Sequence, residues 1–249
     1  VDEKRMIRAN AMVTLENKTS QEAAAWLLRE CLGAEVEAPR GAVGRGWNWA
    51  AVGANTARHL QLVGLSLLVA IAVGIPLGVL ASRSRLLANV TLSLAGLLQT
   101  VPSLALLAFL VPLLGVGLEA ALVALFLYSL LPIVRNTYTG LTTIPGNLAE
   151  AAEAIGLTPA AQLLQVRLPM ASPSILAGIK TSAVINVGTA TLAALVGAGG
   201  LGQPILQGIS LLDNGLILQG AVPAAALALL VQGAFDLLER RVVPLGLRL

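Results

Sequence analysis

The sequence predicts an all-α integral membrane protein with five transmembrane helices, the second of which is broken at Pro102. Two observations lead to this prediction. Hydrophobic residues make up 56% of the 249 residues and charged residues only 12%, whereas an average soluble domain carries about 25% charge. The charges are also unevenly placed, because the first 58 residues hold eight Lys or Arg and seven Asp or Glu, and all later residues hold eight and six. This pattern excludes a single water-soluble domain and a disordered chain.

Few residues in this sequence could carry catalysis or hold a metal ion. Cys31 is the single cysteine and His59 the single histidine, so we expect no internal disulfide, no zinc site and no Ser/His/Asp triad. The net charge is +3, but the basic residues lie between apolar runs and do not form the basic face of a nucleic-acid binder. We therefore expect no catalytic residue, no metal and no nucleic-acid partner. We interpret Val1 as the start of a mature or truncated chain.

Residues 1–36 form a polar segment that we expect to be soluble. Ser20 or Thr19 can cap a helix that Gly33 ends. Residues 11–15 alternate weakly between apolar and polar side chains, which predicts a short strand. About 35 residues cannot bury a core of their own. The segment is therefore either the end of a larger domain or a docked appendage.

Residues 37–58 are predicted to be a linker that ends at the membrane surface, and residues 59–245 to form the transmembrane domain. Trp47 and Trp49 fit the aromatic belt of a membrane interface. The uncharged runs that follow are long enough to cross a hydrocarbon core of about 30 Å. The predicted spans are residues 60–82, 86–115, 116–134, 174–196 and 214–235.

The second uncharged run, residues 86–118, is 33 residues long, which is too long for one untilted crossing. Pro102 would break or kink a helix there. Two crossings would leave each half with only about 15 residues, which is short for a span. We therefore predict five crossings, and treat six as the alternative that would scatter the arginines over both sides.

The arginines predict how the five crossings are oriented. With five crossings the basic residues beyond the linker fall on one side, and the short loops on the other side carry no Lys or Arg. The positive-inside rule makes the arginine-rich side cytoplasmic, which leaves the N-terminal segment outside and the C-terminus inside. The arginines concerned are Arg83, Arg85, Arg135, Arg167, Arg240, Arg241 and Arg248.

The cytoplasmic loop at residues 144–169 is predicted to contain two short helices. Asn147 is a suitable N-cap, with a glutamate three residues later to complete a capping box. Gly156 suits the position just after the first helix, and Thr158 can cap a second helix that ends at Leu168-Pro169. Helices this short are not stable alone in water. They therefore need a partner surface.

The residues of this loop resemble the EAA loop of ATP-binding cassette (ABC) importer permeases. In that family the loop forms a coupling helix that docks on the cytoplasmic ATPase, and the resemblance implies the same role here. A bare amphipathic interfacial loop is the alternative. The matching residues are Glu150, Ala151, Ala152, Gly156, Val166, Leu168 and Pro169, with Asn147 at the start of the helix.

The resemblance also implies the partners of the chain. They would be two cytoplasmic ATPase subunits that bind the ATP and Mg, a second permease subunit in a homodimer, and an extracytoplasmic substrate-binding protein or fused domain. The chain itself would hold no cofactor and would work by alternating access in a bacterial cytoplasmic membrane. A channel or scaffold without an ATPase would have no need of a docking helix in this loop.

Two further segments are similar to permeases that take up glycine betaine, carnitine and choline. These are residues 99–105 and 131–138. The resemblance implies import of a small compatible solute, with methionine or another small solute as the alternative. Residues 8–32 resemble the last strand and helix of the substrate-binding domain of such a system.

Polar residues inside the spans either line a solute path or form hydrogen bonds between helices. Lys180 is expected to extend its amine toward the cytoplasmic surface. Because aromatic residues are too few to build a cage for a quaternary ammonium group, we expect selectivity to lie in the separate binding domain. The residues assigned to the path are Gln99, Thr100, Pro102, Ser103, Asn136, Asn186 and Thr189.

Two glycine motifs fall in or beside the spans. Residues 197–202 satisfy GxGxxG, but they follow a membrane helix and no βαβ unit surrounds them, so we expect a flexible outer loop and no dinucleotide site. Gly74 and Gly78 form a GxxxG pair, for which close packing of two helices is the preferred interpretation.

Overall fold

The computed structural model describes residues 2–16, 18, 20–33 and 47–242, and within these ranges it contains helices and no strand. Residues 37–46 of the predicted linker and the end of the predicted transmembrane domain beyond residue 242 lie outside the described residues. The α-helices are α1 (Glu3–Thr14), α2 (Ser20–Leu32), α3 (Trp49–Ala81), α4 (Arg85–Thr100), α5 (Ser103–Leu114), α6 (Leu118–Thr142), α7 (Gly146–Ala154), α8 (Pro159–Gln162), α9 (Leu168–Thr189), α10 (Gly202–Leu211) and α11 (Asn214–Val242).

The N-terminal helices α1 and α2 pack against each other. The strand predicted at residues 11–15 is wrong, because residues 11–14 belong to α1 and Leu15 is its C-cap. Ala9 and Met12 lie three residues apart on one face of α1 and are buried against Ala23 of α2, which is the periodicity of a helix. The predicted helix that Gly33 ends is confirmed, and Gly33 has the positive φ of +61° that favours glycine after a helix.

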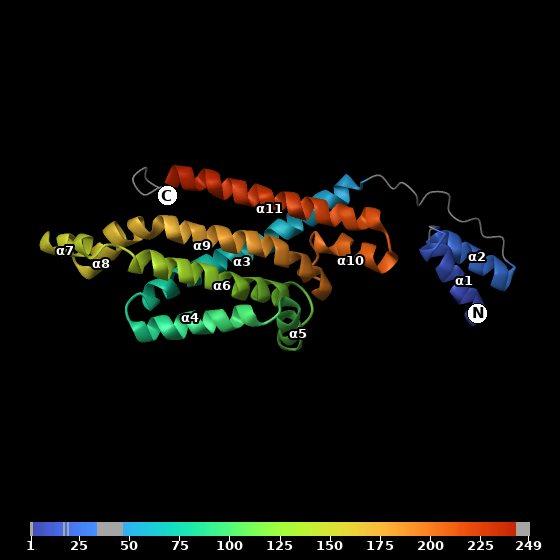
Figure 1. The fold of residues 1–249 in the computed structure, drawn as a ribbon, viewed down its shortest axis with the longest axis horizontal. Helices are drawn as coiled ribbons and strands as arrows, with labels where there is room; N and C mark the ends of the chain where they lie inside the picture. Colours follow the sequence, from blue (N-terminus) through green and yellow to red (C-terminus); the bar gives the residue numbers. More distant parts are fainter. Residues whose placement is uncertain (1, 17, 19, 34–46, 243–249) are drawn as a thin grey trace.

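The long helices α3, α4, α6, α9 and α11 run back and forth along one bundle (Figure 1). Helix α6 is the central one, because it packs against both α3 and α9 and 61% of an apolar 18-residue stretch within it is buried. In α11 only 11% of such a stretch is buried. Helices α7 and α8 lie at one end of the bundle, and α5 and α10 lie at the other (Figure 1).

The second predicted span is broken where the sequence predicts a break. Helix α4 ends at Thr100, α5 begins at Ser103, and the two are bent by 97°. Val101 has extended backbone angles, as expected for a residue before proline. The Tyr128 hydroxyl of α6 donates a hydrogen bond to the Val101 carbonyl, which supplies a partner at the break. Among the described residues four helices could span a membrane, and five when this bent pair counts as one span.

Four predicted spans are longer in the structure. Helix α6 ends at Thr142 and not at residue 134, and α11 ends at Val242 and not at residue 235. Helix α3 begins at Trp49, inside the predicted linker, and not at residue 60. The fourth span was predicted to begin at residue 174, but the helical path runs without a break from Pro159 to Val196 through a π turn at Leu163–Arg167 and a 3₁₀ turn at Ala190–Val196. The predicted end of the second loop helix at Leu168-Pro169 is therefore wrong.

A glycine pair on α3 allows close contact with α6. A Cβ atom added to Gly74 would lie 2.8 Å from Ile133, and one added to Gly78 would lie 2.5 Å from Thr137. Both distances are too short for real Cβ contacts, so only glycine permits this approach. This confirms close helix packing as the role of the GxxxG pair.

Replacing Thr137 with valine is expected to raise the thermal unfolding midpoint of the detergent-solubilised protein. Thr137 is fully buried and its hydroxyl oxygen has no hydrogen-bond partner among the described residues. A buried unsatisfied hydroxyl costs roughly 1–3 kcal/mol, and valine keeps its shape. Thr142→Val, on the exposed side of the same helix where the hydroxyl bonds to the Tyr138 carbonyl at 2.9 Å, should not raise the midpoint. A lower midpoint for Thr137→Val would contradict the prediction.

Candidate coupling segment and solute path

Helix α7 lies at the end of the bundle and is followed by a turn at a glycine. Gly156 has φ of +81°. Its N–H donates to the Glu153 carbonyl at 2.9 Å, and the Leu157 N–H donates to the Ala152 carbonyl at 3.1 Å. This pair of bonds is a Schellman motif with Gly156 at the C′ position. The prediction that Gly156 follows the first loop helix is confirmed.

The start of α7 differs from the prediction. Pro145 is the N-cap residue, and the helix begins at Gly146, so Asn147 lies inside the first turn. Its side chain therefore cannot cap the helix or form the expected capping box. Pro145 has an extended backbone with ψ of 135°, which is the conformation of a residue that directly precedes a helix. Asn147 and Glu150 are both exposed, whereas Ala152 is buried.

The second loop helix is joined to α9. The Thr158 side chain accepts a hydrogen bond from the Ala161 N–H at 3.3 Å and Pro159 takes the first helical position, as predicted. In the π turn the Leu168 N–H donates to the Leu163 carbonyl, five residues back. Pro169 follows immediately and has no N–H to donate, so the wider turn lets the helix pass the proline. Helix α8 is therefore continuous with α9.

The residues assigned to the solute path do not form one surface. Ser103 and Thr189 line the same small cavity, together with Tyr128. Its volume of about 10 Å³ is that of a single water molecule. Gln99 instead donates to the Tyr128 carbonyl at 3.1 Å, Thr100 is exposed and bonds within α4, and Pro102 forms the break.

The two asparagines assigned to the path act between helices or within one. Asn186 is fully buried, and its amide donates to the Ser66 hydroxyl of α3 at 3.1 Å, while its Oδ1 has no partner among the described residues. Asn136 donates to the Pro132 carbonyl at 2.8 Å and packs against Gly178 of α9. In this conformation Asn186 bonds across to α3 and Asn136 packs on α9, and neither lines the small cavity beside Ser103.

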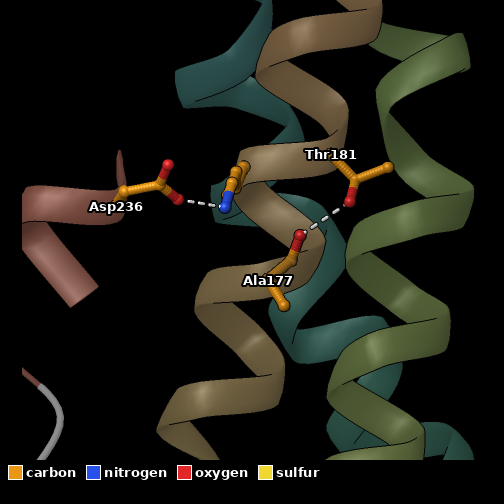
Figure 2. Close-up of polar contacts among 4 residues, drawn as sticks. Ala177, Thr181 and Asp236 are labelled. Carbon is orange, nitrogen blue, oxygen red and sulfur yellow. Dashed lines mark hydrogen bonds and ion pairs between the residues drawn. The ribbon is translucent and has the colours of Figure 1, made fainter. Parts of the chain in front are cut away.

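Lys180 forms an ion pair with Asp236 of α11, and its extension toward the cytoplasmic surface stays a prediction. Figure 2 shows Asp236 directed toward α9, where its carboxylate accepts the hydrogen bond of the lysine amine. Sequence reasoning missed Asp236. The signal available was an acidic residue six positions before the end of α11, directly after the uncharged run of residues 214–235.

The glycine-rich loop of residues 197–202 packs on α3. The His59 Nδ1 atom accepts the Leu201 N–H at 3.3 Å, so the ring proton is assigned to Nε2, which donates to the Val187 carbonyl at 2.9 Å. Arg58 donates from Nε to the Ala198 carbonyl at 3.0 Å. The expectation of a flexible loop is wrong, since the two side chains and the glycines fix it against α3.

A cleft of about 610 Å³ with a mixed polar and apolar lining lies between the start of α3, α10 and α11. Figure 1 shows α10 at the end of the bundle opposite α7 and α8. Gln219 is 9% exposed, and its Oε1 accepts the Asn48 N–H at 3.4 Å. The described lining residues carry no charge. They are Asn48, Ala51, Val52, Asn55, Pro204, Gln207, Leu216 and Gln219.

Residues 74–244 match the family described as binding-protein-dependent transport system inner membrane component. The chain belongs to this family. It is therefore a non-catalytic permease subunit of an ABC transporter and a multi-pass protein of the inner membrane, and ATP and Mg belong to the ATPase subunits with which such a permease works.

Relatives and solved structures place the permease more closely. It is 44% identical over 194 residues to the choline transport system permease protein OpuBB of Bacillus subtilis. The matched residues cover 78% of this chain and 89% of that protein. It is 44% identical over 198 residues to the osmoprotectant import permease protein OsmW of Salmonella typhimurium, covering 78% and 92%. An inward-facing structure of the MetNI methionine ABC transporter matches with a TM-score of 0.73 and 26% identity, covering 81% of this chain and all of that one.

Proposed function

We propose that this permease imports a small quaternary ammonium solute, such as glycine betaine, choline or carnitine, by alternating access. The observation that carries the proposal is 44% identity, over most of both chains, to permeases named for choline and for osmoprotectants. Methionine is the second candidate, because the fold matches a methionine transporter. The identity of 26% to that structure is lower, which favours the quaternary ammonium solutes.

We infer that α7 and α8 form the surface that docks on the ATPase, on the cytoplasmic side. Three large apolar side chains are exposed in this part of the chain. They are Leu148 of α7 at 36%, Ile155 directly after α7 at 76% and Leu164 of the π turn at 65%. Apolar side chains gathered at a bundle end are typical of a partner surface. The residues proposed for the contact are Asn147, Glu150, Ala151, Ala152, Gly156, Val166, Leu168 and Pro169.

The opposite end of the bundle would then face outward, toward a substrate-binding protein or domain. The cleft between α3, α10 and α11, whose described lining residues carry no charge, lies at this end. The small cavity beside Ser103 is too small for a solute in this conformation. We therefore expect selectivity to reside in the binding protein and two identical permeases to enclose the path. Residues 1–36 would belong to the outer side, as the possible end of a binding domain.

The proposal is tested by uptake into proteoliposomes that contain the permease, its ATPase and its binding protein. Radiolabelled glycine betaine, choline, carnitine and methionine are supplied outside, with ATP enclosed on the ATPase side. We expect ATP-dependent accumulation of at least one quaternary ammonium solute and none of methionine. Accumulation of methionine alone, or uptake that does not need ATP, would contradict the proposal. Calorimetry on the permease without the binding protein should show no tight solute binding.

A further inference from the structure

The ion pair between Lys180 and Asp236 joins two membrane helices that are far apart in the sequence. Lys180 lies on α9 and Asp236 on α11, both inside helices long and apolar enough to span a membrane. The side chains are 28% and 44% exposed. In Figure 2 the carboxylate of Asp236 extends from its own helix to the amine on α9.

Charged groups in such helices are costly unless they are paired. Moving α11 away from α9 would separate the two charges. Because the side chains are 28% and 44% exposed, solvent screens part of their attraction, and the pair acts as one specific contact between the two helices. The pair adds a directional contact to the packing between the two helices, because lipid tails can replace apolar neighbours but cannot replace an opposite charge.

The two helices differ in how they are held. Helix α9 is continuous with α8 through the π turn, and α8 follows directly after the glycine turn that ends α7. Helix α11 is mostly exposed, and its first turns pack closely on the α10 region, where a Cβ atom added to Gly220 would lie 2.4 Å from the Leu201 carbonyl oxygen. Asp236 lies in the other half of α11, toward the end of the bundle that carries α7 and α8.

We propose that the Lys180–Asp236 ion pair makes α9 and α11 move as one rigid unit throughout the transport cycle, so that a displacement of α7 and α8 reaches α11. This inference rests on the proposed docking of α7 and α8 on the ATPase. Lys180 and Asp236 are positioning residues, since neither touches solute or nucleotide in this proposal.

The first test measures solute imported per ATP hydrolysed in proteoliposomes containing the full transporter. Lys180→Met and Asp236→Asn are each expected to lower this ratio about fivefold or more, the lower range of coupling between sites, while the ATPase still co-purifies. The exchange Lys180→Asp with Asp236→Lys is expected to restore most of the ratio. Thr181→Val is the matched control, because this neighbouring hydroxyl bonds only to the Ala177 carbonyl of its own helix, at 2.8 Å (Figure 2).

The possible outcomes separate this inference from the proposed function. If the unmodified transporter shows no ATP-dependent uptake, the proposed function fails. If it transports and the single variants keep the normal ratio, only the ion-pair inference fails. A purely structural role would lower uptake and ATP hydrolysis together and leave their ratio unchanged. If the single variants do not fold, the exchange variant decides, and its failure to couple overturns the inference.

The second test asks whether the two helices ever separate. Cysteines at positions 180 and 236, in a background with Cys31→Ser, are joined by a short bifunctional thiol reagent in the assembled transporter. The double-cysteine protein lacks the ion pair and is expected to be poorly coupled until the reagent joins the two helices, which should restore uptake per ATP. A further loss of transport on crosslinking would show that the helices must part, and would overturn the inference.

Discussion

A Gly156→Pro variant is expected to reach the membrane and yet import no solute. The glycine has φ of +81°, and proline fixes φ near −65°. Proline also removes the N–H that donates to the Glu153 carbonyl at 2.9 Å. The turn between α7 and α8 would then have to adopt another path. Because Gly156 is exposed and no heavy atom lies within 4 Å of its missing Cβ, the bundle itself should be unaffected.

The choice of substitutes isolates the backbone as the cause. Asparagine tolerates the left-handed conformation, so Gly156→Asn should keep most of the uptake, whereas Gly156→Val should lose it. The left-handed conformation costs a side-chain residue roughly 1–2 kcal/mol, which corresponds to about 5- to 30-fold in an equilibrium. The same ordering is expected for affinity of the permease for its ATPase, measured by pull-down in detergent.

Gly146→Ala is the control within the same segment, because Gly146 has neither a positive φ nor an atom within 4 Å of its missing Cβ. It should transport normally. If Gly156→Pro and Gly146→Ala transported equally well, the segment would not couple ATP hydrolysis to the bundle, and the docking role of α7 and α8 would have to be abandoned.

Local chemistry explains which features could be predicted from the sequence. The break at Pro102, the glycine turn at Gly156 and the cap at Thr158 depend on residues within a few positions of each other, and each of these predictions is confirmed. The predicted end at Leu168-Pro169 is wrong because the effect of a proline depends on the turn before it. Pro169 has no N–H to donate, and the wider π turn before it lets the helix continue without that hydrogen bond.

Features that depend on distant partners could not be predicted. Lys180 and Asp236 are 56 positions apart, and hydropathy alone gives no reason to pair them. The same is true of His59, whose two ring nitrogens bond to Val187 and Leu201. The docking residues on α7 were inferred from a resemblance, and they remain a prediction, because their test requires the ATPase.

The glycine-rich loop gives the largest expected effect on stability, at Gly202. Sequence analysis predicted a flexible loop there, but a Cβ atom at Gly202 would lie 1.7 Å from the Thr191 carbonyl oxygen and 2.6 Å from its carbon. Both are backbone atoms and cannot move aside as a flexible side chain would. Gly202→Ala is therefore expected to force the 3₁₀ turn and α10 apart, and to lower the free energy of unfolding by about 3 kcal/mol, the upper end for overpacking.

Three alanine substitutions distinguish close packing from backbone strain in this region, measured as thermal midpoints in detergent. Gly188→Ala introduces neither a close contact nor backbone strain, since Gly188 has open space around its missing Cβ and no positive φ. Gly199→Ala tests strain alone, because its φ is +83° and the nearest atom, on Arg58, lies at an ordinary 3.4 Å. Gly202 has no positive φ and tests packing alone. Because the packing penalty acts on two backbone segments, we expect the midpoint to fall in the order Gly188, Gly199, Gly202. If Gly199→Ala lowered the midpoint more than Gly202→Ala, conformational strain and not close contact would be the property that requires glycine in this loop.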